Sequence, residues 1–247
     1  NSHFEVRWVY NARDLFGAEP LGLAYLASFL EQRQFDVKIL DCFAKGMHQV
    51  YRTNGFLRRG LTNSQIEELL LQIRPDVIGI HSNFTMYFPD AEELARLVRK
   101  LFPEKPIVFG GAHATMEARS IIENGIGDFV VRGEGEIPAF DLFSALDKNR
   151  PVDNILGLTY EDGFGKIHTN CDRPLLDEIE SLPRPAWHKL DMDIYIKNSK
   201  NNSPFSMNHP TASLVTSRGC PYNCIFCSTK NMWKRKWRAD SPEKVVD

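Results

Sequence analysis

The sequence lacks any apolar run that approaches the roughly 20 residues needed by a membrane-spanning helix. Its amino terminus also lacks the basic and then apolar order of a secretory signal peptide. These two absences weigh against an integral membrane protein and against a secreted one. We therefore expect a cytoplasmic protein with no membrane partner.

The sequence has little excess charge of either sign. Lys and Arg total 30 and Asp and Glu total 32, which leaves a formal net charge of -2. A protein without a strong field has no general attraction to nucleic acid or anionic lipid. The basic segment Lys234–Arg238, with Trp233 and Trp237, could stack on nucleic acid, but a solvated surface or a phosphate contact explains it more simply. We expect a small-molecule substrate and no nucleic-acid partner.

Several common functional motifs are also missing. No P-loop, dinucleotide-binding fingerprint or Ser-His-Asp arrangement is visible, so hydrolase and nucleotide-binding functions have no support. The five cysteines lack the dispersed, even-numbered spacing of a disulfide framework. Three of them fall within eight residues. Clustered thiols in a reducing compartment indicate a metal.

The first 150 residues alternate short β-rich runs with amphipathic stretches, which is typical of a parallel sheet covered by helices. The candidate strands, apolar enough to be buried on both faces, are Val6–Tyr10, Val37–Asp41, Val77–His81, Ile107–Gly110 and Phe129–Arg132. The candidate helices are Leu21–Arg33, Ser64–Ile73, Asp90–Leu101, Thr115–Glu123 and Ile137–Asp147, with Ser64 and Asp90 as the expected caps of two of them. The pattern predicts an α/β fold over residues 1–150: a flavodoxin-like, doubly wound, five-stranded parallel sheet that binds ligands beyond the carboxyl ends of its strands.

The rest of the chain predicts a change of domain. Leu156–Tyr160 and Lys166–Thr169 flank a Gly-containing turn and predict a β-hairpin, and the Pro-rich segment 182–187 follows, so residues 151–210 are expected to be hairpin and linker. In residues 211–247, Ala212–Thr216 is a candidate strand and Ser241–Glu243 opens a helix with Pro in its first turn. Since these pieces cannot close a core alone, we expect a larger second domain that continues past Asp247.

Cys220, Cys224 and Cys227 form a Cys-x3-Cys-x2-Cys loop directly after the expected strand. A structural zinc site usually needs four ligands, and no second cysteine pair follows. Iron-sulfur clusters normally take four cysteines, so three on one loop indicate a 4Fe-4S cluster with one iron open to a non-protein ligand. A zinc or redox site completed by residues outside this sequence stays open as an alternative.

The stretch Ser217–Ser228, which reads SRGCPYNCIFCS, resembles the signature loop of the radical S-adenosylmethionine (SAM) superfamily. The resemblance implies that the three cysteines ligate the cluster, that SAM binds the open iron, and that Phe226 lies near the adenosyl group. It also implies cleavage of SAM to a 5′-deoxyadenosyl radical, with electrons from an external donor such as flavodoxin or ferredoxin. The family builds this chemistry on a β/α barrel, of which residues 211–247 would be the truncated beginning.

Four upstream motifs are similar to the cobalamin-binding domain that precedes many radical SAM enzymes. They are Pro20–Ala27, Pro75–Ile80, Gly110–Thr115 and Val131–Glu136. The resemblance implies cobalamin as a cofactor. Gly110 and Gly111 end a strand where backbone can approach a bulky ligand closely, and Ser82 and Asn83 end another strand, where their polar groups could meet the cofactor tail. Glu134 lies at a helix start that offers backbone amides for docking.

Histidine is missing where some cobalamin domains place an axial ligand. The segment Asn11–Gly17 follows the first expected strand and contains none, so the resemblance implies a cobalamin without an imidazole from that loop. His81 and His113 lie near strand ends, but a hydrogen-bonded structural histidine is the commoner outcome at such positions. We do not expect either to be a ligand.

These resemblances predict an enzyme, namely a cobalamin-dependent radical SAM enzyme, or its amino-terminal portion, that transfers a methyl group to an unactivated carbon. The 247 residues alone are expected to be inactive, because the barrel is incomplete. One alternative is a radical SAM enzyme of another reaction type, a cyclase or oxidase, whose amino-terminal domain does not bind cobalamin. Another is a non-catalytic cobalamin-binding or redox module. A methylthiotransferase would need three further cysteines in the amino-terminal domain, which holds only Cys42.

Overall fold

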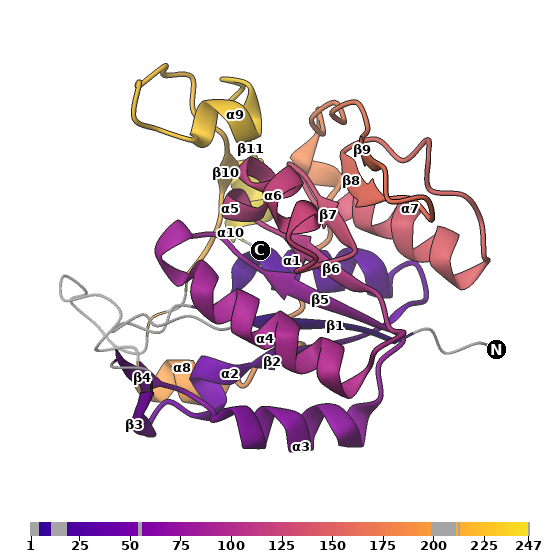
Figure 1. Cartoon of the computed structure of the whole chain (residues 1–247). Helices are drawn as coiled ribbons and strands as arrows, with labels where there is room; N and C mark the ends of the chain where they lie inside the picture. The colour runs from indigo at the N-terminus through magenta and orange to yellow at the C-terminus, as the bar shows by residue number, and fades with distance from the viewer. Residues whose placement is uncertain (1–4, 11–18, 54–55, 199–210, 212, 247) are drawn as a thin grey trace.

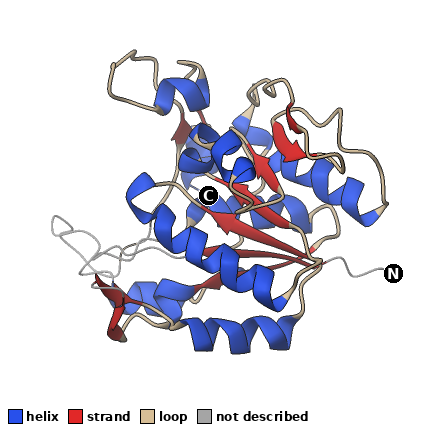
Figure 2. Cartoon of the chain, in the orientation of Figure 1, coloured by secondary structure: helices blue, strands red, loops and turns tan. Residues whose placement is uncertain are grey.

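The computed structural model describes residues 5–10, 19–53, 56–198, 211 and 213–246. A central sheet runs through the molecule with helices on both of its faces (Figure 1, Figure 2). Its parallel part contains, in spatial order, β2 (Asp36–Asp41), β1 (Glu5–Tyr10), β5 (Val77–His81), β6 (Ile107–Gly110) and β7 (Phe129–Val131). The five predicted strands are confirmed. Because β1 pairs with both β2 and β5, the strand order reverses there, as in a doubly wound sheet.

The sheet is mixed, and on this point the prediction of a purely parallel sheet was wrong. The predicted hairpin forms β8 (Leu158–Glu161) and β9 (Ile167–Thr169), and β8 pairs antiparallel with β7. In the described part of the chain this gives one sheet of seven strands. The physical reason is that β7 would otherwise be an edge strand with unpaired backbone groups, which β8 satisfies.

Two layers of helices bury the two faces of the sheet. One apolar cluster involves α1 (Leu21–Glu31) and α7 (Glu136–Asp147), and the other involves α3 (Asn63–Ile73), α4 (Phe88–Leu101) and α6 (Ala118–Glu123). The strands between them are apolar on both sides, as a sheet covered on both faces requires. None of the described helices is long and apolar enough to cross a membrane.

The two predicted helix caps were wrong. Thr62, rather than Ser64, caps α3, in a capping box with Gln65, so the helix begins one residue earlier than expected. Asp90 lies inside the first turn of α4, which begins at Phe88 with Pro89 in its first turn. The Asp90 carboxylate is buried and pairs with a guanidinium instead of capping the helix.

Two other predicted elements differ. The predicted helix Thr115–Glu123 is broken at Glu117 into α5 (Ala112–Met116) and α6. Residues 213–216 of the predicted strand Ala212–Thr216 form no strand, and Ala212 lies outside the described residues. The strand begins later, as β10 (Ser217–Arg218), because its antiparallel partner β11 (Arg238–Ala239) reaches only those residues.

Several short elements were not predicted from the sequence. They are α2 (Cys42–Lys45), the hairpin of β3 (Val50–Thr53) and β4 (Phe56–Arg59), the 3-10 turns η1 (Thr85–Tyr87), η2 (Ile179–Ser181) and η3 (Trp187–Lys189), α8 (Met192–Asn198) and α9 (Thr229–Trp233). The helix expected to open at Ser241 forms as α10 (Pro242–Val246). The predicted linker packs closely: Ala186, Leu190 and Tyr195 are buried in the apolar cluster that contains α1.

Candidate functional site

The loops after β5 and β6 lie together at the edge of the sheet formed by the carboxyl ends of its parallel strands, here called the carboxyl edge. Asn83 Oδ1 accepts a hydrogen bond from the backbone N–H of Ala112 at 3.1 Å. The Ser82 carbonyl oxygen accepts from His113 N at 3.1 Å, and Ser82 N donates to the Gly110 carbonyl at 2.8 Å. The structure therefore brings Ser82, Asn83 and Gly110, which end two different strands, together.

Gly111 has a structural reason to be glycine. Its φ is +108°, and a Cβ at this position would lie 2.5 Å from the Ser82 carbonyl oxygen and 2.8 Å from Asn83 Oδ1. The close approach at Gly111 is therefore one between two protein loops, whereas the sequence predicted an approach to a ligand. Contact of Gly110 and Gly111 with a cofactor stays a prediction.

Two histidines stand at the same edge. His113 is 6% exposed; its Nδ1 lies 3.0 Å from Thr85 Oγ1 and its ring packs on Phe88 with a centroid distance of 4.4 Å. His113 Nε2 is buried and has no hydrogen-bond partner among the described residues. Burial lowers the pKa of His113, and burial lowers the pKa of His81 to about 4, although a hydrogen bond with Asn83 opposes that shift. Both imidazoles are therefore neutral near pH 7.

The carboxylate of Glu134 is engaged within the protein. Its two oxygens each lie 2.9 Å from a guanidinium nitrogen of Arg238, and Oε2 also accepts from Leu176 N at 2.9 Å. The cofactor role predicted for this position rested on backbone amides of the turn between β7 and α7. The side chain instead pairs with Arg238, a role that was not predicted from the sequence.

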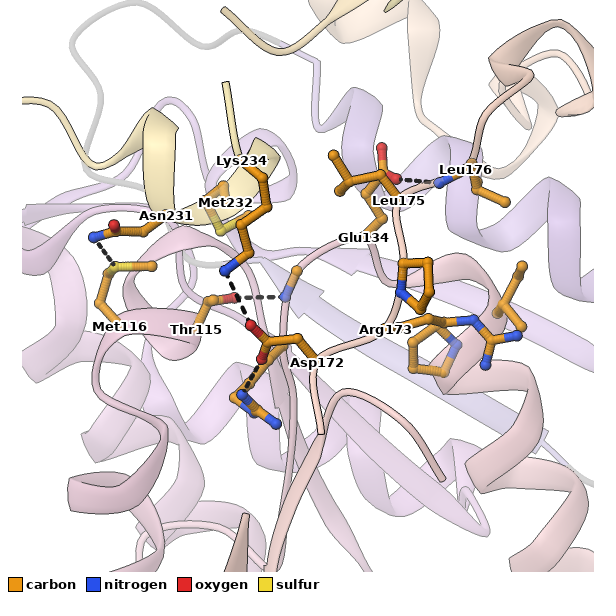
Figure 3. A pocket seen from close by; sticks show the side chains of 15 residues that line it. Thr115, Met116, Glu134, Asp172, Arg173, Leu175, Leu176, Asn231, Met232 and Lys234 are labelled. Atoms are coloured by element: carbon orange, nitrogen blue, oxygen red, sulfur yellow. Dashed lines mark hydrogen bonds and ion pairs between the residues drawn. The ribbon is translucent and has the colours of Figure 1, made fainter. Parts of the chain in front are cut away.

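A cavity of about 250 Å³ lies where this turn meets α5, the segment after β9 and α9. Figure 3 shows two bridges across it: Lys234 Nζ lies 2.9 Å from Asp172 Oδ2, and Asn231 Nδ2 lies 3.5 Å from Met116 Sδ. Gly133 lines the cavity with a φ of +76°, and nothing lies within 4 Å of a Cβ built on it. Since whole cofactors and drug-sized ligands occupy about 300–1,000 Å³, the cavity has room only for part of a large ligand.

The cysteine loop projects from the base formed by β10 and β11 (Figure 1). Cys224 is exposed and Cys220 and Cys227 are half-buried. Among the residues that the structure describes, no three Cys, His, Asp or Glu side chains form a group that could hold a metal ion, so the three thiols do not converge. Metal coordination and ordering of a site are coupled, because the metal itself draws its ligands together. Phe226, the predicted SAM contact, is 89% exposed on the same loop.

The chemistry of this donor set fits iron. Thiolates, rather than thiols, are metal ligands. Hydrogen bonds from the side chain and the backbone N–H of Thr229 lower the pKa of Cys227, which favours its thiolate form. Burial raises the pKa of Cys42 instead, so the isolated cysteine of the sheet domain stays a neutral thiol.

Gly219 closes the base of the loop. Its φ is +91°, and a Cβ there would lie 1.9 Å from the carbonyl oxygen of Lys236. Lys236 N in turn donates to the Trp233 carbonyl at 2.8 Å. The loop therefore returns over its own first residues, and only glycine fits at the crossing.

The residues at the carboxyl edge fit a cobalamin in part. The open space over Gly133 and the unpartnered, buried Nε2 of His113 are features that a large polar cofactor would fill. Neither histidine comes from the segment Asn11–Gly17, which lies outside the described residues.

Comparison with known proteins gives a family match and similar methyltransferases. Residues 7–142 match the family described as B12 binding domain. The chain is 32% identical over 251 residues to cytidylyl-2-hydroxyethylphosphonate methyltransferase of Streptomyces wedmorensis, covering 92% of this chain and 47% of that protein. It is 34% identical over 229 residues to an uncharacterized methyltransferase of Pyrococcus horikoshii, covering 92% and 44%. The chain thus spans about half the length of these relatives.

A solved structure has the same fold. The cobalamin-dependent S-adenosylmethionine radical enzyme OxsB, with aqua-cobalamin and S-adenosylmethionine bound, superimposes with a TM-score of 0.73 at 22% identity. The match covers 99% of this chain and 31% of that one. At this identity the likeness concerns the fold alone.

Proposed function

The chain belongs to the B12 binding domain family, and from that premise we propose that it is the cofactor-binding part of a cobalamin-dependent radical SAM methyltransferase. The proposal assigns cobalamin to the carboxyl edge of the sheet and a 4Fe-4S cluster with SAM to the cysteine loop. The names of the two curated relatives, both methyltransferases, support the reaction class.

One observation carries the proposal. The segment that follows the cysteines lies against the carboxyl edge, because α9 contacts α5 and Asn231 reaches Met116 across the cavity. Ligands of doubly wound sheets sit beyond the carboxyl ends of the strands. A cluster held by this loop would therefore face a cofactor bound at that edge.

The chain's own residues have separate tasks in this proposal. Cys220, Cys224 and Cys227 would hold iron as thiolates, and the exposed Phe226 would pack beside SAM. The loops that carry Ser82 and Gly111 are fixed to each other by hydrogen bonds, which gives a preformed surface for the cobalamin. When bound, the cluster and SAM supply a radical and the cobalamin supplies a methyl group, while the protein orients both against a substrate. A small-molecule substrate and an external electron donor such as flavodoxin or ferredoxin complete the proposal.

Cleavage of SAM by the anaerobically reconstituted full-length protein tests the proposal. With a chemical reductant we expect 5′-deoxyadenosine, detected by chromatography and mass spectrometry, and none from the Cys224→Ala variant. Cys171→Ala is the matched control, since Cys171 is an exposed cysteine outside the loop. Equal product from both variants would contradict the cluster assignment.

SAM with a deuterated methyl group separates the methyltransferase from the cyclase or oxidase alternative. Transfer of the label to cobalamin, seen as methylcobalamin by mass spectrometry, supports methyl transfer. Formation of 5′-deoxyadenosine without cobalamin binding would favour a radical SAM enzyme of another reaction type.

A further inference from the structure

Four charged side chains meet where the base of the cysteine loop touches the carboxyl edge. Glu134 comes from the turn between β7 and α7, and Glu136 is the first residue of α7. Arg218 and Arg238 come from β10 and β11. Arg238 forms two 2.9 Å hydrogen bonds with Glu134. Arg218 Nη2 lies 2.6 Å from Glu136 Oε1, and its Nη1 lies 3.5 Å from Glu134 Oε1. We call these four residues the junction network.

The junction network is buried. The exposed fractions of the side chains are 5% for Arg238, 8% for Glu134, 6% for Glu136 and 14% for Arg218. Exposed ion pairs contribute little, whereas loss of one partner from a buried pair leaves an uncompensated charge at high cost. The network contains two positive and two negative charges, so removal of any one side chain leaves an unbalanced charge in a buried place.

The two arginines close the loop itself. Arg218 and Arg238 are opposite each other in the pairing of β10 with β11, and Arg218 precedes the first loop cysteine by two positions. Two ion pairs made by residues between the loop and β11, Lys234 with Asp172 and Lys236 with Asp177, have side chains between 48% and 83% exposed. The buried network is therefore the main electrostatic attachment of the loop to the sheet.

We propose that Arg218 and Arg238 are positioning residues that hold the cysteine loop in one place relative to the carboxyl edge, with Glu134 and Glu136 as their fixed counter-charges. Resting on the proposed function, this means that the network sets the separation between the cluster and cobalamin. A radical and a methyl donor must reach the same substrate atom, and small misplacements of reacting groups cost rate heavily.

Hydrogen exchange on the protein without cofactors tests the attachment independently of the proposed function. Arg218→Lys keeps the charge but cannot pair with both glutamates through a planar fork. We expect amides of residues 217–227 to exchange faster by about tenfold in Arg218→Lys and about a hundredfold in Arg238→Gln. Arg99→Gln, which removes the Arg99–Asp128 pair elsewhere on the molecule, is the control and should leave the loop unchanged. Exchange of the loop that stays at the wild-type rate in both network variants would overturn the proposal.

A spectroscopic measurement on the reconstituted protein tests whether the network sets the separation between the cluster and cobalamin. Dipolar coupling between cobalt(II) of cobalamin and the reduced cluster reports the distance between them by electron paramagnetic resonance. In Arg218→Lys we expect a broadened distribution of cluster–cobalt distances at unchanged iron and cobalt content. No variant that lacks the guanidinium fork at position 218 should have the wild-type distribution. An unchanged distribution in Arg218→Lys would refute the positioning role. Absence of either metal from the wild-type protein would instead refute the proposed function, and the exchange experiment would still decide the attachment.

Discussion

Replacing Asp41 by Asn tests how α8, in the segment after the β8–β9 hairpin, is held against the sheet. Asp41 ends β2, is 6% exposed, and accepts a hydrogen bond from Ala44 N at 2.8 Å as the cap of α2. Its other oxygen accepts a hydrogen bond from the hydroxyl group of Tyr195, which belongs to α8 and is 1% exposed. The contact joins residues 154 positions apart, so it attaches α8 directly to the sheet.

Burial raises the pKa of Asp41 from 3.8 to about 6, and the hydrogen bonds from Ala44 and Tyr195 oppose this only in part. Since the pKa is higher in the folded protein than in the unfolded chain, the fold binds this proton more tightly. The contribution of Asp41 to the free energy of unfolding is therefore greatest below about pH 4 and falls as the pH rises through about 6. A difference of about two units corresponds to roughly 3 kcal/mol.

Asp41→Asn keeps an acceptor for Ala44 N and is neutral at every pH. We expect its free energy of unfolding at pH 7 to exceed the wild-type value by roughly 2 kcal/mol, and the gain to vanish near pH 4. Urea unfolding followed by circular dichroism across this pH range measures both. Asp191→Asn is the control, because the Asp191–Lys45 pair is exposed and should change stability by less than about 1 kcal/mol. A gain independent of pH, or an Asn variant less stable than wild type at pH 7, would show that Asp41 is not destabilised by its buried charge.

Three further changes have expected outcomes. Gly219→Ala should cost roughly 2 kcal/mol and speed hydrogen exchange in the cysteine loop, because its Cβ would lie 1.9 Å from a backbone oxygen, whereas Gly163→Ala, with open space around it, should not. Thr62→Ala should lower the free energy of unfolding by about 1 kcal/mol in urea titrations, and Thr62→Ser should retain the cap. Thr229→Val should slow alkylation of Cys227 by iodoacetamide near neutral pH, because it removes a hydrogen bond that lowers the thiol pKa, and Thr229→Ser should restore the rate.

The parallel strands could be predicted because their signal is local. Val77–His81 and Ile107–Gly110 are short apolar runs, and both form with the predicted bounds. Pairing of β8 with β7 could not be predicted, since neither the sequence of β7 nor that of the hairpin indicates which strand it pairs with. The cap at Thr62 was missed for a local reason: Ser64, two residues later, has the same capping chemistry.

The candidate site also has one part that the sequence predicts and one part that it does not. The loop cysteines and the loops at Ser82 and Gly111 follow from spacing and from strand ends. The junction network does not, because Arg218 and Glu136 are 82 positions apart and Arg238 and Glu134 are 104 apart. Nothing in either segment alone indicates its partner, and only the path of the chain brings the four charges together.

The central claim is that one chain holds an iron-sulfur cluster on its cysteine loop and cobalamin at its carboxyl edge. Anaerobic reconstitution of the protein with iron, sulfide and hydroxocobalamin, followed by desalting, metal analysis and visible spectroscopy, tests it most directly. We expect about four irons and about one cobalt per chain, with iron lost and cobalt retained in Cys220→Ala. Iron without cobalt would contradict the assignment of cobalamin to the sheet, and absence of iron from the wild-type protein would contradict the cluster.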